Sequence, residues 1–206
     1  KMKSKFALVT GASEGIGFEF CKKLASKGYN ILLVARTLKK LHVAAKSLQN
    51  TYNIQTQVIS CDLASPNAAQ TLFDEVQSLN ISVDVLVNNA GLLFNGFFKD
   101  IDLANQEKLL QCNIVALTSI THIFANDMSS RGYGRILNVA STAAWVAIPN
   151  QNIYAASKAY VLSFSNALAD EMKAAGTGVT ITAVCPSYTD TKMLDNPEQG
   201  AALNIP

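Results

Sequence analysis

Two side chains with complementary acid–base properties lie one helical turn apart in the segment Tyr154-Ala-Ala-Ser-Lys158. At positions i and i+4 of a helix, the tyrosine and the lysine share one face. A tyrosine has a pKa of about 10 in water, so alone it exchanges protons poorly at neutral pH. A neighbouring ammonium, or a positively charged nicotinamide ring, favours the phenolate and lowers that pKa. The pair is therefore a candidate for proton transfer, although the same spacing also occurs in purely structural helices.

Two further polar residues are candidates for the same site. Ser141 follows an apolar, strand-like run and precedes Tyr154 by 13 residues. Asn113 lies within a helical pattern, where a buried amide needs a hydrogen-bonding role. Because the C-terminal ends of parallel strands open on one crevice, we expect these residues to come together there.

A glycine-rich turn near the N-terminus, Thr10-Gly11-Ala-Ser13-Glu14-Gly15-Ile16-Gly17, has the composition of a phosphate-binding loop. Its glycines allow a tight turn, close approach of a phosphate to the backbone, and close packing of helix on strand. The helix that begins there presents unpaired N–H groups and a positive dipole end to an anion. A glycine triplet alone is a weak signal, but between a first strand and a first helix it predicts a dinucleotide site.

The charges after this turn indicate which dinucleotide is bound. NAD sites usually carry a carboxylate about 20 residues further on, at the end of the second strand. Here that strand ends at Arg36, and no acidic residue occurs between Glu19 and Asp62, an interval with seven lysine or arginine residues. The planar guanidinium of Arg36 suits a 2′-phosphate, so we expect NADP(H). Glu14 is unfavourable beside a phosphate.

The elements that must position these residues alternate in type along the chain. Short continuous apolar runs at 5–10, 30–35, 57–61, 83–87, 135–139 and 179–184 predict strands buried on both faces. Helical patterns separate them, the longest at 104–128 and 153–174. This order predicts an α/β fold with a doubly wound, parallel, Rossmann-type sheet, and one domain over residues 1–206.

Composition excludes several other classes of protein. The 206 residues are 49% hydrophobic with a net charge of +2, which speaks against a disordered chain and gives no reason to expect nucleic acid as a partner. No unbroken apolar run approaches 18 residues, and the basic segment 1–5 precedes too short an apolar run for a signal peptide. We therefore expect a cytoplasmic protein without a membrane span. Four scattered cysteines and two histidines predict neither a disulfide framework nor a metal site.

Taken together, the motifs resemble the short-chain dehydrogenase/reductase family, in its common subgroup with the TGxxxGxG and YxxxK motifs. The matching segments lie between Thr10 and Thr191, almost the whole chain, in the family's order. They are Thr10–Gly17, Asp62-Leu63, Asn88-Asn89-Ala90-Gly91, Asn113, Ser141, Tyr154–Lys158 and Cys185–Thr191. The resemblance implies a Rossmann sheet in strand order 3-2-1-4-5-6-7 and hydride transfer between NAD(P)H and a carbonyl or alcohol.

The resemblance also implies roles for the candidate catalytic residues. Tyr154 would be the general acid in reduction and the general base in oxidation, and Ser141 would hydrogen-bond the substrate oxygen. Lys158 would bind the nicotinamide ribose and lower the pKa of Tyr154. Asn113 would hold a water that links Lys158 to solvent as a proton relay.

Further implied contacts concern the cofactor and the substrate. Asp62 would bind the adenine, Asn89 the adenosine ribose, and Thr191 the nicotinamide carboxamide. The full set of expected cofactor contacts is Gly11, Ser13, Glu14, Gly15, Ile16, Gly17, Arg36, Asp62, Leu63, Asn89, Ala90, Gly91, Tyr154, Lys158, Pro186, Ser187, Thr189 and Thr191. Beside Ser141 and Tyr154, the residues Leu93, Phe94 and Trp145 are expected to form an apolar wall, which favours an apolar or amphipathic substrate.

The sequence departs from the family pattern at two places. Pro186-Ser187 stands where the family usually has Pro-Gly. Family members also continue through a substrate lid and a seventh strand, so we expect that lid and strand to be missing from a sequence of 206 residues. Without them, a homodimer through the two long helices is expected, and a tetramer only if the C-terminal segment exists.

Three functions stay open at this point. The first is an NADPH-dependent reductase of a carbonyl compound. The second is a catalytically silent NADP(H)-binding protein with a regulatory or scaffold role, which the set Asn113, Ser141, Tyr154 and Lys158 disfavours and the expected lack of a lid favours. The third is epimerase or lyase chemistry, which in this family more often accompanies a GxxGxxG turn that the chain lacks.

Overall fold

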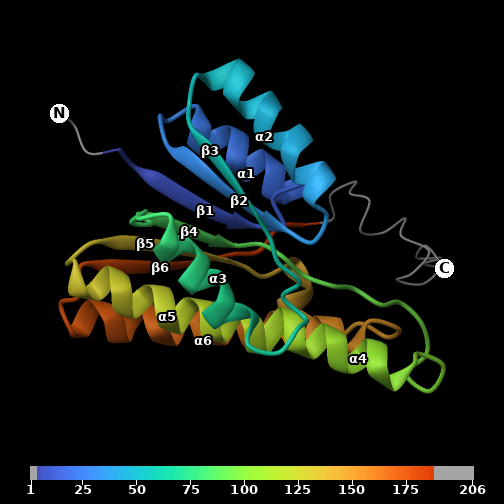
Figure 1. Ribbon diagram of the computed structural model, residues 1–206. Helices are drawn as coiled ribbons and strands as arrows, with labels where there is room; N and C mark the ends of the chain where they lie inside the picture. The colour runs from blue at the N-terminus through green and yellow to red at the C-terminus, as the bar shows by residue number, and fades with distance from the viewer. Residues whose placement is uncertain (1–3, 188–206) are drawn as a thin grey trace.

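A six-stranded parallel sheet forms the centre of the protein in the computed structural model, which describes residues 4–187 (Figure 1). The strand order is β3-β2-β1-β4-β5-β6. The strands are β1 (Phe6–Thr10), β2 (Asn30–Ala35), β3 (Thr56–Ser60), β4 (Val85–Asn88), β5 (Gly134–Val139) and β6 (Val179–Val184). This confirms the predicted fold class. The expectation about a seventh strand concerns residues outside the described part of the chain.

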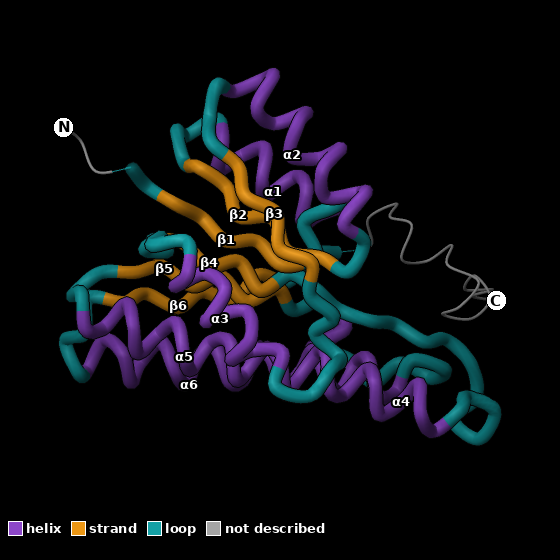
Figure 2. The backbone as a smooth tube through the Cα atoms, viewed as in Figure 1, coloured by secondary structure: helices purple, strands orange, loops and turns teal. Residues whose placement is uncertain are grey.

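Helices cover both faces of the sheet (Figures 1 and 2). On one face lie α1 (Gly15–Ala25) and α2 (Leu38–Tyr52), and on the other lie α3 (Ala68–Ser78), α5 (Leu117–Ser130) and α6 (Asn152–Ala174). The order of the strands reverses between β1 and β4, which lie side by side in the middle of the sheet. In doubly wound sheets, ligands bind at the C-terminal ends of the strands at this reversal.

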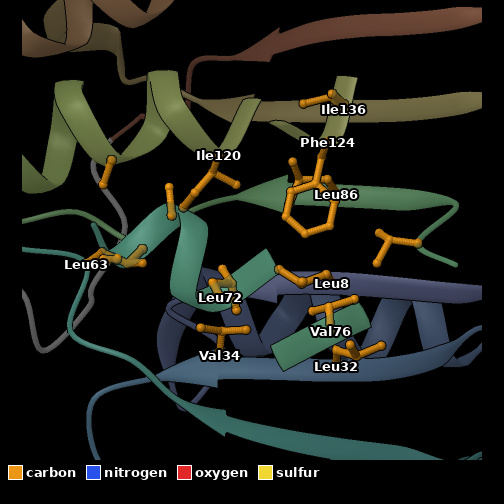
Figure 3. Packing of buried hydrophobic residues seen from close by; sticks show 14 of the residues in the cluster. Leu8, Leu32, Val34, Leu63, Leu72, Val76, Leu86, Ile120, Phe124 and Ile136 are labelled. Atoms are coloured by element: carbon orange, nitrogen blue, oxygen red, sulfur yellow. The ribbon is translucent and has the colours of Figure 1, made fainter. Parts of the chain in front are cut away.

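The strands read as continuous apolar runs because the two helical layers bury both of their faces. Ala7 and Val9 of β1 belong to the core beneath α1 and α2, whereas Leu8 between them belongs to the core beneath α3 and α5. Figure 3 shows Leu8 in this second core with Leu72 and Phe124, which come from α3 and α5. Alternate side chains of β1 thus pack into different cores on the two faces of the sheet. Packing on both faces holds the end of the strand in a fixed position.

The sequence predicts one continuous helix at 104–128, but the structure has three consecutive segments there. They are α4 (Leu103–Leu110), a π-helical turn over Gln111–Ala116, and α5. The spacing of apolar residues did not reveal the π turn, because one wider turn shifts the helical period by only about one residue. Asn113 lies within that turn.

The combined stretch Leu103–Ser130 is long and apolar enough, by length and composition alone, to cross a membrane. Its most apolar window has a mean hydropathy of 1.2, and half of that window is buried within the fold. The search for unbroken apolar runs did not reveal this stretch, because polar residues interrupt it. Core helices of soluble proteins have the same composition, so the stretch is weak evidence for a span.

Candidate active site

A cavity of about 790 Å³ opens at the C-terminal ends of the strands. Its volume lies within the range of about 300–1,000 Å³ that is usual for small-molecule sites. The loops that follow β1 to β5 all contribute to its wall, through Gly11, Arg36, Asp62, Asn89 and Ser141 respectively. The cavity therefore lies where the strand order reverses, as the sequence predicts.

The glycine turn at one end of the cavity uses its glycines in two ways. Gly11 and Gly15 have φ angles of +64° and +58°, in the left-handed region that favours glycine. A Cβ atom on Gly17 would overlap the carbonyl oxygen of Gly11, so this position is fixed by close packing. Glu14 at the N-cap of α1 makes no side-chain capping bond, and the first turn contains no acidic residue. The first N–H groups of α1 are therefore available to an anion.

The loop after β4 holds the glycine turn in place. The side-chain amide of Asn89 donates to the carbonyl oxygens of Thr10 at 3.0 Å and Gly11 at 3.3 Å. In return, the hydroxyl oxygen of Thr10 accepts from the backbone N–H groups of Asn89 and Ala90, each at 3.0 Å. These four bonds connect residues about 80 positions apart and fix the two central loops against each other.

Three charged residues line the cavity beside the N-terminus of α2. Arg36 follows β2, and Lys40 lies one turn further along, in the first turn of α2. The ammonium of Lys40 lies 3.2 Å from both carboxylate oxygens of Glu14. This ion pair offsets the negative charge that made Glu14 unfavourable beside a phosphate. The sequence analysis missed Lys40, although its spacing of four residues from Arg36 was a usable signal.

The ammonium of Lys158 lies deep beside the tyrosine of the YxxxK segment. Lys158 is only 5% exposed, and its Nζ donates to the carbonyl oxygen of Val139 at 2.9 Å. The same Nζ lies 5.7 Å from the centre of the Tyr154 ring, so both side chains share one face of α6. Burial lowers the pKa of Lys158 from 10.5 to about 8, which the nearby thiols of Cys112 and Cys185 partly oppose.

Asn113 lies behind this site, not in the cavity wall, and is 1% exposed. Its side-chain oxygen accepts from the N–H of Leu92 at 2.8 Å, and its amide donates to the carbonyl of Leu92 at 2.9 Å and to the hydroxyl of Ser157 at 3.2 Å. The π turn brings this amide towards the loop after β4, as such turns often do at functional sites. Asn113 thus fixes Leu92 and, through Ser157, the face of α6 that carries Tyr154 and Lys158.

Ser141 begins a short 3₁₀ helix over Thr142–Trp145, directly after β5. Its side-chain oxygen accepts from the N–H of Ala143 at 3.1 Å. Because the oxygen acts as an acceptor there, the hydroxyl hydrogen can be donated into the cavity. The structure therefore presents a hydroxyl donor, a phenol and a buried ammonium at one end of the cavity.

Most of the predicted site residues come together in this cavity. Those in its wall are Gly11, Ser13, Glu14, Gly15, Ile16, Arg36, Asp62, Leu63, Asn89, Ala90, Gly91, Leu93, Ser141, Tyr154, Lys158, Pro186 and Ser187. The expected contacts at Thr189 and Thr191 lie outside the described residues. The segment Trp145–Ile148 was also expected near the substrate, and its residues Val146 and Ile148 line the wall. The sequence analysis missed other wall residues, among them Cys112 and Gln151.

Three predicted ligand contacts are not part of the cavity wall. Gly17 packs against Gly11 behind the turn. Phe94 is half-buried and packs against the core beneath α3 and α5. Trp145, at the end of the 3₁₀ helix, is 68% exposed, and its neighbour Val146 lines the cavity in its place.

The sequence of this chain is similar to those of known proteins. The family profile described as short chain dehydrogenase matches residues 5–201. Very-long-chain 3-oxoacyl-CoA reductase-A of Danio rerio is 34% identical over 193 residues, 92% of this chain and 59% of the relative. The 17-beta-hydroxysteroid dehydrogenase type 3 of Homo sapiens is 34% identical over 191 residues, 92% of this chain and 60% of the relative. The chain thus spans about three-fifths of the length of these two relatives.

A solved structure with a bound cofactor is similar as well. The short-chain dehydrogenase from Sphingobium yanoikuyae in complex with NADPH has a TM-score of 0.87 to this chain at 29% sequence identity. The match covers 93% of this chain and 73% of that one.

Proposed function

Because this chain belongs to the short-chain dehydrogenase family, we propose that it is an NADPH-dependent oxidoreductase that transfers a hydride between the nicotinamide and a carbonyl or alcohol substrate. One observation carries the proposal. A buried ammonium, Lys158, lies 5.7 Å from the ring of Tyr154, and both residues line the cavity with Ser141. A site that only binds a dinucleotide has no need of an activated phenol.

The residues of the cavity fit a nicotinamide dinucleotide. At the glycine turn, the N–H groups of α1 and the absence of side chains at Gly11 and Gly15 suit a pyrophosphate. At Gly91, an added Cβ would lie 3.4 Å from Oδ1 of Asn113 and 3.6 Å from Nζ of Lys158. Gly91 thus keeps the backbone close to Lys158, the residue that would hold the nicotinamide ribose. The bound cofactor would supply the hydride.

The preference for NADP(H) over NAD(H) rests on the charges at the N-terminus of α2. Arg36 and Lys40 both line this part of the cavity, and Lys40 is paired there with Glu14, so Arg36 is the cation that would meet a 2′-phosphate. A 2′-phosphate would accept bidentate hydrogen bonds from the Arg36 guanidinium. The relative from Sphingobium yanoikuyae, whose structure contains NADPH, supports this choice.

The source of the proton that the substrate oxygen receives is the group of polar side chains around Tyr154. In reduction, Tyr154 gives its phenolic proton to the substrate oxygen while the carbonyl carbon receives the hydride. The hydroxyl of Ser141 donates a hydrogen bond to the same oxygen and holds it near the phenol. The ammonium of Lys158 stabilises the phenolate that remains. In oxidation, the same groups act in reverse order.

Apolar side chains contribute to the wall where the substrate would lie. Leu93, Val146 and Ile148 line the wall there, beside Ser141. An apolar or amphipathic carbonyl compound fits this wall, in agreement with the 3-oxoacyl and steroid classes in the names of the two relatives.

The Tyr154→Phe variant tests the proposal against a catalytically silent binding protein. We expect this variant to bind NADPH nearly as tightly as the wild type, measured by the rise in cofactor fluorescence. It should lose carbonyl-dependent NADPH oxidation by at least about a hundredfold, since acid catalysis contributes about 10²–10⁴-fold. Turnover that survives in Tyr154→Phe, or is absent from the wild type over a panel of ketones and aldehydes, would refute the proposal.

We also propose that the protein forms a homodimer through α5 and α6. The two helices lie along the same face of the sheet (Figure 1), and Thr118 and Tyr160 hydrogen-bond across them at 2.9 Å. Tyr160 is 37% exposed and stacks on Phe164, with 5.7 Å between ring centres, and Val115, in the π-helical turn that leads into α5, is 47% exposed. Exposed apolar side chains on neighbouring helices are typical of a subunit interface.

A further inference from the structure

The wall of the cavity contains a buried polar group that no step of the proposed reaction uses. Gln151 is 3% exposed, and its side-chain Nε2 has no hydrogen-bond partner among residues 4–187. Its backbone is fully bonded, since its N–H donates to the carbonyl of Ile148 at 3.1 Å and its carbonyl accepts from the N–H of Ala155 at 2.8 Å. The unpartnered atom is therefore Nε2 of the side chain. A buried donor without a partner is destabilising, so its retention needs a reason.

The place of Gln151 in the fold gives that reason. It precedes the first residue of α6 and lines the same cavity as Ser141 and Tyr154. Three residues separate it from Tyr154, which is about 4.5 Å along the helix axis. The buried Oδ1 of Asn88 likewise has no partner within residues 4–187, but Asn88 lies in the core, and its own side-chain nitrogen donates to Thr121 and Asn138.

We propose that Gln151 is a specificity-determining residue that donates a hydrogen bond to a second oxygen of the substrate, close to the reacting carbonyl. The proposal rests on the function proposed above, because it takes the reacting oxygen to lie at Tyr154 and Ser141. The last torsion of a glutamine side chain is soft, so the amide can turn its N–H groups from the cavity wall towards a bound oxygen.

The spacing along α6 selects a class of substrate. An acceptor within one helical turn of the reacting oxygen matches a 3-oxoacyl compound, whose ester or thioester carbonyl lies two carbons from the keto carbon. A ketone without a second oxygen leaves the amide of Gln151 unpaired. Sites built to bond a polar group discriminate against analogues that lack it, because the buried donor then stays unsatisfied.

Two probes of equal chain length separate these cases. Ethyl 3-oxobutanoate and 2-heptanone both have a methyl ketone at one end of a seven-atom chain, but only the first carries a second carbonyl. The test variant is Gln151→Met, which keeps the length of the side chain and removes the donor. Each probe is titrated against the NADP⁺-saturated protein by the fluorescence of Trp145, the single tryptophan, and assayed for NADPH oxidation.

We expect Gln151→Met to lower the affinity and kcat/KM for ethyl 3-oxobutanoate by about tenfold, the effect of losing one hydrogen bond from a buried donor. Both values for 2-heptanone should stay within about twofold. The midpoint of thermal unfolding should be unchanged or higher, because the variant removes an unsatisfied group. Equal losses on the two probes, or no loss on either, would overturn the role of Gln151.

The two proposals can fail separately. Selective loss of ethyl 3-oxobutanoate binding in Gln151→Met, without turnover of either probe by the wild type, would support the binding role of Gln151 and refute the reductase. Turnover by the wild type that is lost equally for both probes would support the reductase and overturn the role of Gln151.

Discussion

Lys158→Met removes the ammonium buried beneath Tyr154 and allows its energetic cost to be measured. Burial lowers the pKa of Lys158 from 10.5 to about 8. At 1.36 kcal/mol for each tenfold change in proton affinity, this fall corresponds to about 3 kcal/mol of destabilisation by the charged form at neutral pH. Methionine has a similar length and no charge, but it gives up the bond to the Val139 carbonyl, which contributes about 1 kcal/mol. The net expectation is that the variant is more stable by about 2 kcal/mol at pH 7.

The dependence on pH has a definite sign. The pKa in the folded state, about 8, lies below the unfolded value of 10.5. Between these two values the unfolded chain binds more protons, so the free energy of unfolding of the wild type rises with pH through this window. The cost is fully present below pH 8. The advantage of Lys158→Met should therefore shrink between pH 8 and pH 10.5.

Thermal and urea unfolding at pH 7 and pH 10, followed by far-UV circular dichroism, check this expectation. If the free energy of unfolding of Lys158→Met is higher than that of the wild type by about 2 kcal/mol at pH 7, Tm should rise by about 4–8 °C for a chain of this size. The matched control is Lys173→Met, which removes an exposed ammonium from the last turn of the same helix. The thiol of Cys112 also titrates in this range, and the ammonium of Lys158 lowers its pKa, so the pH dependence lost in Lys158→Met is that of the two groups together.

Two results would refute this account of Lys158. One is a variant that is less stable than the wild type at pH 7. The other is a difference in stability that stays the same at pH 7 and pH 10, since a buried charge must show the proton linkage. The expected gain in stability accompanies a loss of turnover, because Lys158 is the residue that would hold the ribose and stabilise the phenolate. Active sites commonly retain destabilising groups for this reason.

Two further predictions concern the cofactor end of the cavity. Arg36→Asp should weaken NADPH binding by at least about tenfold and leave NADH binding within about threefold, whereas Lys39→Asp, the same charge change one turn away and outside the cavity wall, should change neither. Fluorescence titration of both cofactors measures this, and an unchanged NADPH-to-NADH ratio in Arg36→Asp would contradict the 2′-phosphate role. Gly17→Ala should lower the free energy of unfolding by about 1–3 kcal/mol and impair NADPH binding, because the new methyl group overlaps the carbonyl of Gly11. A urea midpoint and an NADPH Kd equal to those of the wild type would show that the turn does not require a glycine there.

Local patterns in the sequence were enough to predict the layers of the fold and which polar residues share the cavity. Strands buried on both faces read as continuous apolar runs, so six of them separated by helical patterns specify a covered parallel sheet. The strand ends then follow, because parallel strands place all their C-terminal ends at one edge. Tyr154 and Lys158 were found together since the spacing of four residues fixes their common face within one helix.

Tertiary structure decided every feature that depends on contacts between distant segments. Lys40 neutralises Glu14 across 26 positions of sequence, and Asn89 holds the glycine turn from 79 positions away. Whether an aromatic residue near the site faces the cavity, the core or solvent is also a matter of packing, which is why Phe94 and Trp145 lie outside the cavity wall in which they were expected.

The amide of Gln151 shows the same division most clearly. In the sequence, Gln151 is an ordinary polar residue before a helix, and it belongs to no motif that would indicate a role in the site. Its lack of a partner exists only once the surrounding chain has buried it. The sequence alone determined which residues share an element and which strand ends share an edge, because these depend on the backbone period. Only the folded chain decided which polar groups are satisfied, because hydrogen bonding and burial depend on all the neighbours at once.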